Sequence, residues 1–179
     1  FDFKNLNYQS ERVSSTYLDS LGINHVILKP DKKRTYMVYL DYQEINGKAY
    51  IKNDMWGDDS DIDADYAMVH FNLPYPNKLA GGDVYVYGEL SGWSFSRKNK
   101  LVYDETAKAY TGTVYLKQGY YNYEYVFLAN DKNEGDASVF EGDHQETEND
   151  YTILIYHRML SDGYDRIVGA RTVNSKINR

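Results

Sequence analysis

The sequence predicts an all-β protein organised as a sandwich of short strands. Apolar and polar residues alternate with a period of two over many segments, which is typical of half-buried strands. No segment carries a convincing 3.6-residue period, so we expect helices to be short or absent. Gly, Asn and Asp residues separate the segments in the manner of turns. Many short strands connected in this way indicate a β-sandwich.

The first block, residues 1–57, is rich in predicted strands but looks too small for an independent core. Either it is part of a truncated second β-domain, or its strands pack on the block that follows. A turn-like ING at 45–47 joins the last two of its strands. The predicted strands are NHVILK (24–29), RTYMVYL (34–40) and KAYIKN (48–53).

An acidic run, DMWGDDSDIDADY (54–66), separates the two strand-rich blocks, and we expect residues 58–65 to form a solvated linker. Its alternating aspartates begin like an EF-hand loop. The Gly and Glu that such a loop requires at its sixth and twelfth positions are missing. The sequence therefore predicts no metal site here.

The second block, residues 66–157, has the right size for one immunoglobulin-like sandwich of the early-set type. In its most aromatic segment, YYNYEYVFL (120–128), three tyrosines and a phenylalanine alternate onto one face, which we expect to be core. The remaining residues, 158–179, form a tail with five basic and two acidic side chains, either a solvated terminus or a docking segment. The other predicted strands are 66–73, 83–90, 110–117 and 151–157.

Composition narrows the function classes. The net charge of −7 argues against nucleic acid, because binding phosphates requires clustered Lys and Arg. With no cysteine, the chain can form neither a disulfide nor a cysteine-based metal site. No run of about 18 apolar residues is present, so we expect no membrane-spanning segment. A start at Phe1 without an apolar leader leads us to expect a fragment or a processed protein.

Catalytic motifs find little support. The four histidines are scattered in sequence, no H-E-x-x-H pair occurs, and no serine lies in a G-x-S-x-G elbow. No P-loop or G-x-G-x-x-G follows a predicted strand. We therefore expect a binding protein without catalytic residues, metal or cofactor.

Residues 82–157 resemble the glycogen-binding sandwich of family 48 carbohydrate-binding modules. The resemblance rests on a strand followed by GELSGW (88–93), and on LKQGYYNYEYVF (116–127). It implies a stacking role for Trp93 and a hydrogen-bonding role for Asn149. The family's basic residue in the tyrosine-rich strand is Glu124 here, and its second Trp is missing from LANDKNEG (128–135). Glucan binding is therefore the alternative function.

A resemblance over nearly the whole chain is to the C-terminal part of the type IX secretion system plug proteins of Bacteroidota. It implies a periplasmic protein, associated with the outer membrane, that docks beneath the translocon barrel and occludes its periplasmic opening. The residues that carry it are DYQEINGKAYIKN (41–53), DSDIDADYAMVHFNLP (59–74), GDVYVYGELSGW (82–93), LKQGYYNYEYVF (116–127), EGDHQETENDYTILIYHR (141–158) and YDRIVGARTVNS (164–175).

A plug role gives the outward tyrosines of the predicted strands a function. Tyrosine is enriched at protein interfaces, where its ring supplies contact area and its hydroxyl a hydrogen bond. We therefore expect a protein interface that includes some or all of Tyr85, Tyr87, Tyr115, Tyr164 and Arg166.

Overall fold

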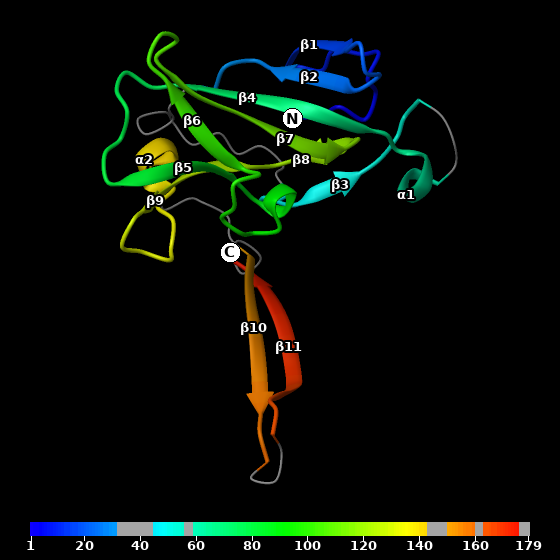
Figure 1. The fold of residues 1–179 in the computed structure, drawn as a ribbon. Coiled ribbons are helices and arrows are strands. Elements are labelled where there is room, and N and C mark those ends of the chain that lie inside the picture. The colour runs from blue at the N-terminus through cyan, green and yellow to red at the C-terminus, as the bar shows by residue number, and fades with distance from the viewer. Residues whose placement is uncertain (32–44, 56–58, 143–149, 160–162, 176–179) are drawn as a thin grey trace. The chain divides into compact units, whose positions relative to one another are not determined.

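The fold of the chain is nearly all β, as the sequence predicts (Figure 1). A computed structural model describes residues 1–31, 45–55, 59–142, 150–159 and 163–175. Within these ranges the helices are single turns: α1 (Ser60–Asp63), α2 (Ser138–Glu141) and the 3-10 turn η1 (Glu89–Ser91). The chain divides into two units, residues 1–143 and 144–179. The all-β sandwich prediction is confirmed, and the immunoglobulin-like subtype stays a prediction.

The first unit is built on a seven-stranded mixed sheet with the strand order β1-β2-β4-β7-β6-β5-β9, and a two-stranded sheet pairs β3 with β8. Its strands are β1 (Val13–Leu18), β2 (Asn24–Leu28), β3 (Ala49–Ile51), β4 (Tyr66–Pro74), β5 (Gly82–Tyr87), β6 (Lys100–Asp104), β7 (Ala109–Lys117), β8 (Gly119–Tyr121) and β9 (Glu124–Ala129).

Strand pairing in the large sheet is antiparallel except between β2 and β4, which run parallel with Val26 opposite Val69. The longest ladder joins β4 to β7 over nine residue pairs, from Tyr66 with Lys117 to Pro74 with Ala109. Alternate residues of β4 point into the core, as the period of two predicts. The buried set on this strand is Ala67, Val69, Phe71 and Leu73.

The aromatic segment that follows β7 is core, as predicted. Tyr121 and Tyr125 are buried, and Tyr123 and Phe127 pack against the same cluster. The ring of Tyr123 meets Phe71 of β4 edge-on at 5.1 Å. Val126, on the opposite face, is also buried, and Gly135 lies so close to it that an added Cβ would be 2.0 Å from the Val126 Cγ1 atom. Much of the tyrosine content is therefore packing.

A carboxylate beneath this core holds the aromatic strand to the N-terminal strands. Asp31 accepts hydrogen bonds from the hydroxyls of Tyr123 (2.7 Å) and Tyr125 (2.6 Å) and pairs with the guanidinium of Arg12. Burial, with the Asp31 charge as a second cause, raises the pKa of the Tyr123 hydroxyl well above its usual range. Both tyrosines therefore stay neutral donors to the carboxylate.

The units differ from the domain boundaries that the sequence predicts. Of the two alternatives for residues 1–57, the described strands agree with packing on the block that follows, because β1 and β2 extend the large sheet and β3 pairs with β8. Val26 and Leu28 of β2 are buried in the common core. The strand predicted at 34–40 lies outside the described residues.

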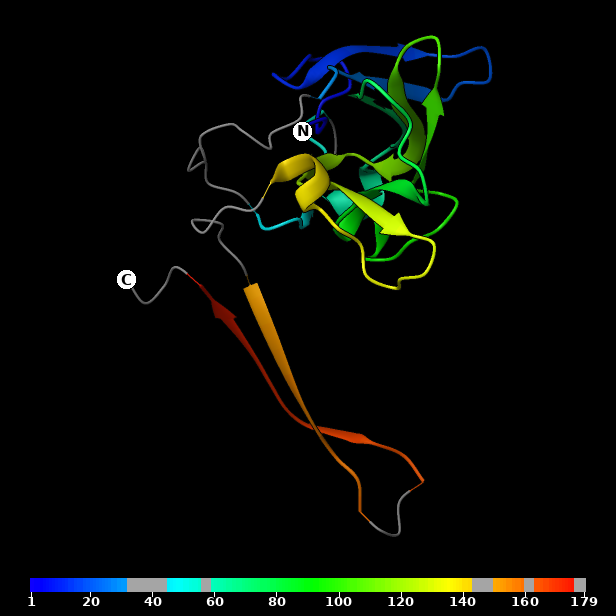
Figure 2. The same ribbon diagram turned by 90° about the vertical axis from the view of Figure 1, so that its left-hand side faces the viewer.

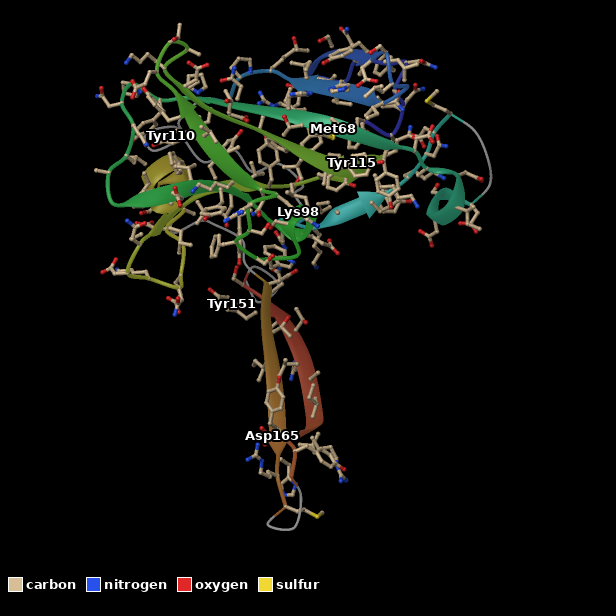
Figure 3. All side chains as sticks on the ribbon, viewed as in Figure 1. Met68, Lys98, Tyr110, Tyr115, Tyr151 and Asp165 are labelled. Carbon is tan, nitrogen blue, oxygen red and sulfur yellow. The ribbon has the colours of Figure 1, made fainter. Side chains whose placement is uncertain are left out.

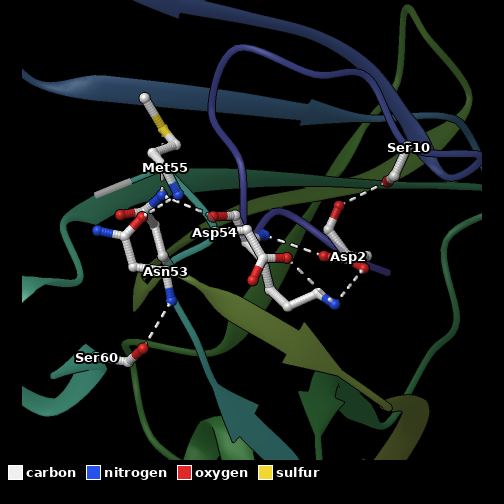
Figure 4. Close-up of polar contacts among 8 residues, drawn as sticks. Asp2, Ser10, Asn53, Asp54, Met55 and Ser60 are labelled. Atoms are coloured by element: carbon white, nitrogen blue, oxygen red, sulfur yellow. Dashed lines mark hydrogen bonds and ion pairs between the residues drawn. The ribbon is translucent and has the colours of Figure 1, made fainter. Parts of the chain in front are cut away.

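The segment predicted as a linker (58–65) is tied to the first unit in the part that the structure describes. Asn53 is buried, and its side-chain amide donates a hydrogen bond to the Asp63 carbonyl oxygen (2.9 Å). Its backbone N–H donates to the Ser60 hydroxyl at 3.1 Å (Figure 4). Two hydrogen bonds join Asp65 to the buried Gln118. The Asp65 N–H donates to the Gln118 side-chain oxygen, and the Gln118 N–H donates to the Asp65 carbonyl oxygen. The acidic segment thus contains a helical turn, α1, that is hydrogen bonded to the first unit.

The second unit is a β-hairpin of β10 (Asp150–His157) and β11 (Arg166–Asn174), whose strands lie side by side in both views (Figures 1 and 2). A bulge between Ile155 and Tyr156 interrupts the antiparallel register. The strand predicted at 151–157 therefore pairs with residues of the predicted tail (158–179).

Candidate functional site

The β10–β11 hairpin exposes an unusual amount of apolar surface. A two-stranded hairpin is marginally stable alone in water. Large apolar side chains normally gain about 1.5–3 kcal/mol each from burial. The exposed apolar and aromatic side chains of this segment are Tyr151, Ile153, Leu154, Ile155, Tyr156, Met159, Tyr164, Ile167 and Val168.

Both faces of the hairpin carry this apolar character. Residues 151, 153 and 155 alternate onto one face of β10, where Ile155 lies against Gly169 of β11. Leu154 lies on the opposite face, with Ala170 directly across from it. A flat surface would cover only one of these faces, so burial of both requires contacts from two sides, as a concave surface provides.

Charged and aromatic side chains gather at the end of the hairpin where β10 connects to β11. Arg158 forms a bidentate ion pair with Asp165 at 2.8 and 2.9 Å. The guanidinium of Arg166 lies 5.7 Å from the centre of the Tyr164 ring and donates to its hydroxyl at 3.2 Å. Tyr164 and Arg166 thus contact each other. Tyr151 and Asp165 mark opposite ends of the hairpin (Figure 3).

Trp93 lies in the turn after β5 and is both a packing residue and an exposed ring. Its side chain is 48% exposed, yet a Cβ atom on Gly47 would lie 2.6 Å from the indole. Tyr87 meets the indole edge-on at 5.6 Å and donates its hydroxyl hydrogen to the Trp93 carbonyl at 3.2 Å. The ring therefore offers one part of its surface to a ligand.

Tyr85 and Tyr87 point to the outer face of β5, as expected, but the loop after β5 folds over them. Phe95 stacks on Tyr87 at 5.0 Å and meets Tyr85 edge-on at 5.2 Å. Tyr85 is left only 9% exposed, and Tyr87 is partly buried. Tyr85 is thus covered by this chain's own Phe95, contrary to the expectation that it faces a partner.

Tyr115 is well exposed on the outer face of β7, opposite Met68 of β4 (Figure 3). Its ring stacks on Tyr66 at 5.0 Å, and Lys117 lies over the Tyr66 ring. The predicted interface residues therefore occupy three separate places: the covered face of β5, the outer face of β7 and the hairpin. Asn149, the predicted glycan partner of Trp93, lies outside the described residues.

The structure also assembles residues that the sequence treats as unrelated. His25 and His70, 45 positions apart, are hydrogen bonded to each other on the outer face of the sheet. Only the parallel pairing of β2 with β4 brings them together. Among the residues that the structure describes, no cluster of three or more His, Asp or Glu side chains could hold a metal ion. No helix in these ranges is long and apolar enough to span a membrane.

The turn at Gly88 depends on glycine, and a substitution should reveal this. Gly88 has a φ of 146°, and an added Cβ would lie 3.0 Å from the Gly47 carbonyl oxygen. We expect Gly88→Ala to lower the free energy of unfolding by about 1–3 kcal/mol, measured by urea denaturation. Gly92 has a φ of 60° with open space around it, so Gly92→Ala should cost only about 1 kcal/mol. A larger loss for Gly92→Ala than for Gly88→Ala would contradict this account.

Fold and site together define an all-β protein with an exposed hairpin and surface aromatic residues. No profile of a known protein family matches the chain, and no curated protein matches it. The chain is similar to a crystal structure of a hypothetical protein from Parabacteroides merdae ATCC 43184, at 33% identity and a TM-score of 0.89. That similarity covers 97% of this chain and 43% of the other, so this chain spans less than half the length of its structural relative.

Proposed function

We propose that this chain is a non-catalytic periplasmic subunit that binds the outer-membrane translocon of a type IX secretion system and occludes its periplasmic opening. The observation that carries the proposal is the β10–β11 hairpin, whose isoleucines and tyrosines are exposed on both faces. Such a surface is stabilised when a partner removes it from water. The concave mouth of a barrel is a partner of the required shape.

The sequence resemblance supports the same assignment. Two of the six segments that resemble the plug proteins, 141–158 and 164–175, contribute β10 and β11. The remaining segments that fall on described residues contribute mainly buried strands of the first unit, including β4 and β5. Within the hairpin unit itself these two segments bury few side chains, and a partner-binding role accounts for their composition.

The chemistry of the surface is that of binding. Tyrosine and arginine are the residues most enriched at interface hot spots, and Tyr164 and Arg166 lie together near the end of the hairpin.

The test is recovery of the partner. Tagged full-length protein is incubated with detergent-solubilised outer membranes, and the retained proteins are identified by mass spectrometry. We expect a large barrel protein in near-equal amount. Recovery of soluble proteins alone, or of nothing, would sink the proposal.

Glucan binding is the alternative, and the half-exposed ring of Trp93 favours it. Stacking of a sugar on this ring would change the tryptophan emission. The plug assignment predicts an unchanged spectrum when a soluble α-glucan is added at millimolar concentration. A saturable change that Trp93→Ala removes would instead establish the alternative, with the buried Tyr85→Phe as the matched control.

A further inference from the structure

His25 and His70 are the centre of a hydrogen-bonded chain on the outer face of the large sheet. His25 Nδ1 lies 2.8 Å from His70 Nε2. At the two ends, His25 Nε2 lies 3.3 Å from an Asp19 carboxylate oxygen, and His70 Nδ1 lies 3.1 Å from the Thr113 hydroxyl. The ring of Tyr17 stacks on His25 at 4.6 Å. Strands β2, β4 and β7 and the turn after β1 contribute the hydrogen-bonded groups, and β1 contributes the stacked Tyr17 ring.

One arrangement of protons satisfies every contact when both rings are neutral. Thr113 donates to His70 Nδ1, His70 Nε2–H donates to His25 Nδ1, and His25 Nε2–H donates to Asp19. A single added proton is also accommodated. A His25 ring that carries a hydrogen on both nitrogens donates to the Asp19 carboxylate on one side and to the unprotonated Nε2 of His70 on the other.

A second added proton removes the hydrogen bond between His25 and His70. With both rings charged, every ring nitrogen carries a hydrogen, so two N–H donors would face each other across 2.8 Å. Two like charges at this separation also repel, and Asp19 can offset only one of them. The contact between His25 and His70 is therefore incompatible with the doubly protonated pair.

The contact lies where the first hairpin meets the rest of the sheet. The parallel ladder of β2 with β4 covers four residue pairs, from Asn24 with Ala67 to Ile27 with His70. β1 is an edge strand that pairs with β2. On the other face, Val26 and Leu28 remain buried in the core, so loss of the histidine contact loosens the hairpin without removing its apolar anchor.

We propose that the His25–His70 pair is a proton-operated latch, which holds the β1–β2 hairpin on β4 at neutral pH and releases its outer side in acid. The groups that face the pair are Tyr17 from β1, Asp19 from the turn, and Thr113 from β7. Of these, Asp19 alone is charged at neutral pH. The latch is independent of what the β10–β11 hairpin binds.

The direction of the pH effect follows from the surroundings of His70. Burial, and then the charge of His25, lowers the pKa of His70 from its ordinary value near 6.5. At pH values between the lowered pKa of His70 and its ordinary value, the unfolded chain therefore binds more protons than the folded chain. The stability that the latch contributes is therefore complete above about pH 6.5 and is lost as the pH falls below it.

Amide hydrogen exchange tests the latch in the full chain. After correction for intrinsic rates, we expect opening of residues 24–27 to increase severalfold between pH 7.5 and pH 5. Amides of β5 should not change. His70→Gln, which cannot take the second proton, should remove most of this difference, whereas the control His157→Gln should retain it. Equal increases in the wild type and His70→Gln would overturn the proposal.

Imidazole NMR of the unmodified chain provides a second test that needs no variant. The latch requires His70 to take up its proton below the ordinary histidine value near 6.5. Titration of the His70 ring at or above pH 6.5 would contradict the proposal.

Discussion

Replacing Ile153 and Ile155 together by serine is expected to weaken binding to the translocon barrel by at least about a hundredfold. The two side chains lie on the same face of β10 and are 53% and 56% exposed. If a partner buries them, each contributes about 1.5–3 kcal/mol, and every 1.4 kcal/mol changes the dissociation constant tenfold. Binding of the tagged double variant to immobilised, solubilised barrel measures the effect.

The matched control for this variant is Val102→Ser. Val102 is an exposed β-branched residue on β6 of the first unit, outside the hairpin, and its substitution should leave the affinity unchanged. Because all three side chains are exposed, thermal unfolding of the first unit should be the same in the variants. Wild-type affinity of the Ile153→Ser, Ile155→Ser double variant would show that the hairpin is not the binding surface.

Replacing Asp31 by alanine should cost about 3–5 kcal/mol of unfolding free energy, a large part of the stability of a typical domain. Asp31, whose side chain is 16% exposed, is the shared acceptor for Tyr123, Tyr125 and the Arg12 guanidinium. Its removal leaves two tyrosine hydroxyls and a guanidinium without their partner. Urea denaturation followed by far-UV circular dichroism measures the loss.

Asp31→Asn provides the graded comparison. Both tyrosine hydroxyls donate to the same oxygen, Oδ2, so a carboxamide oxygen at that place can still accept them, whereas the side facing Arg12 loses its charge and its acceptor. We expect an intermediate loss of stability. A cost below about 1 kcal/mol for Asp31→Ala would show that the cluster is a surface feature with little energetic weight.

The sequence predicted the strands well because their signal is local. A period of two in 66–73 locates β4 and its buried face, and the aromatic alternation after Gly119 identifies core residues. It does not identify which strands pair. The parallel ladder of β2 with β4, and the pairing of β10 with β11, depend on long-range register that periodicity leaves open. The domain boundaries differed for this reason.

The same limit applies to the candidate sites. The period correctly directs Tyr85 to the outer face of β5, but the loop that carries Phe95 covers it. A second aromatic residue two positions after Trp93 was the available signal for that packing. His25 and His70 carry no signal in the sequence, since only the register of a non-local ladder joins them.

The measurement that tests the central claim most directly is site-specific photo-crosslinking from the hairpin. A photoreactive residue at position 155 is compared in outer-membrane extracts with the same residue at position 102, which is exposed on the first unit. The account predicts an adduct with a large outer-membrane barrel protein from position 155 and none from position 102. Absence of a barrel adduct from position 155, in extracts where the barrel is present, would contradict it.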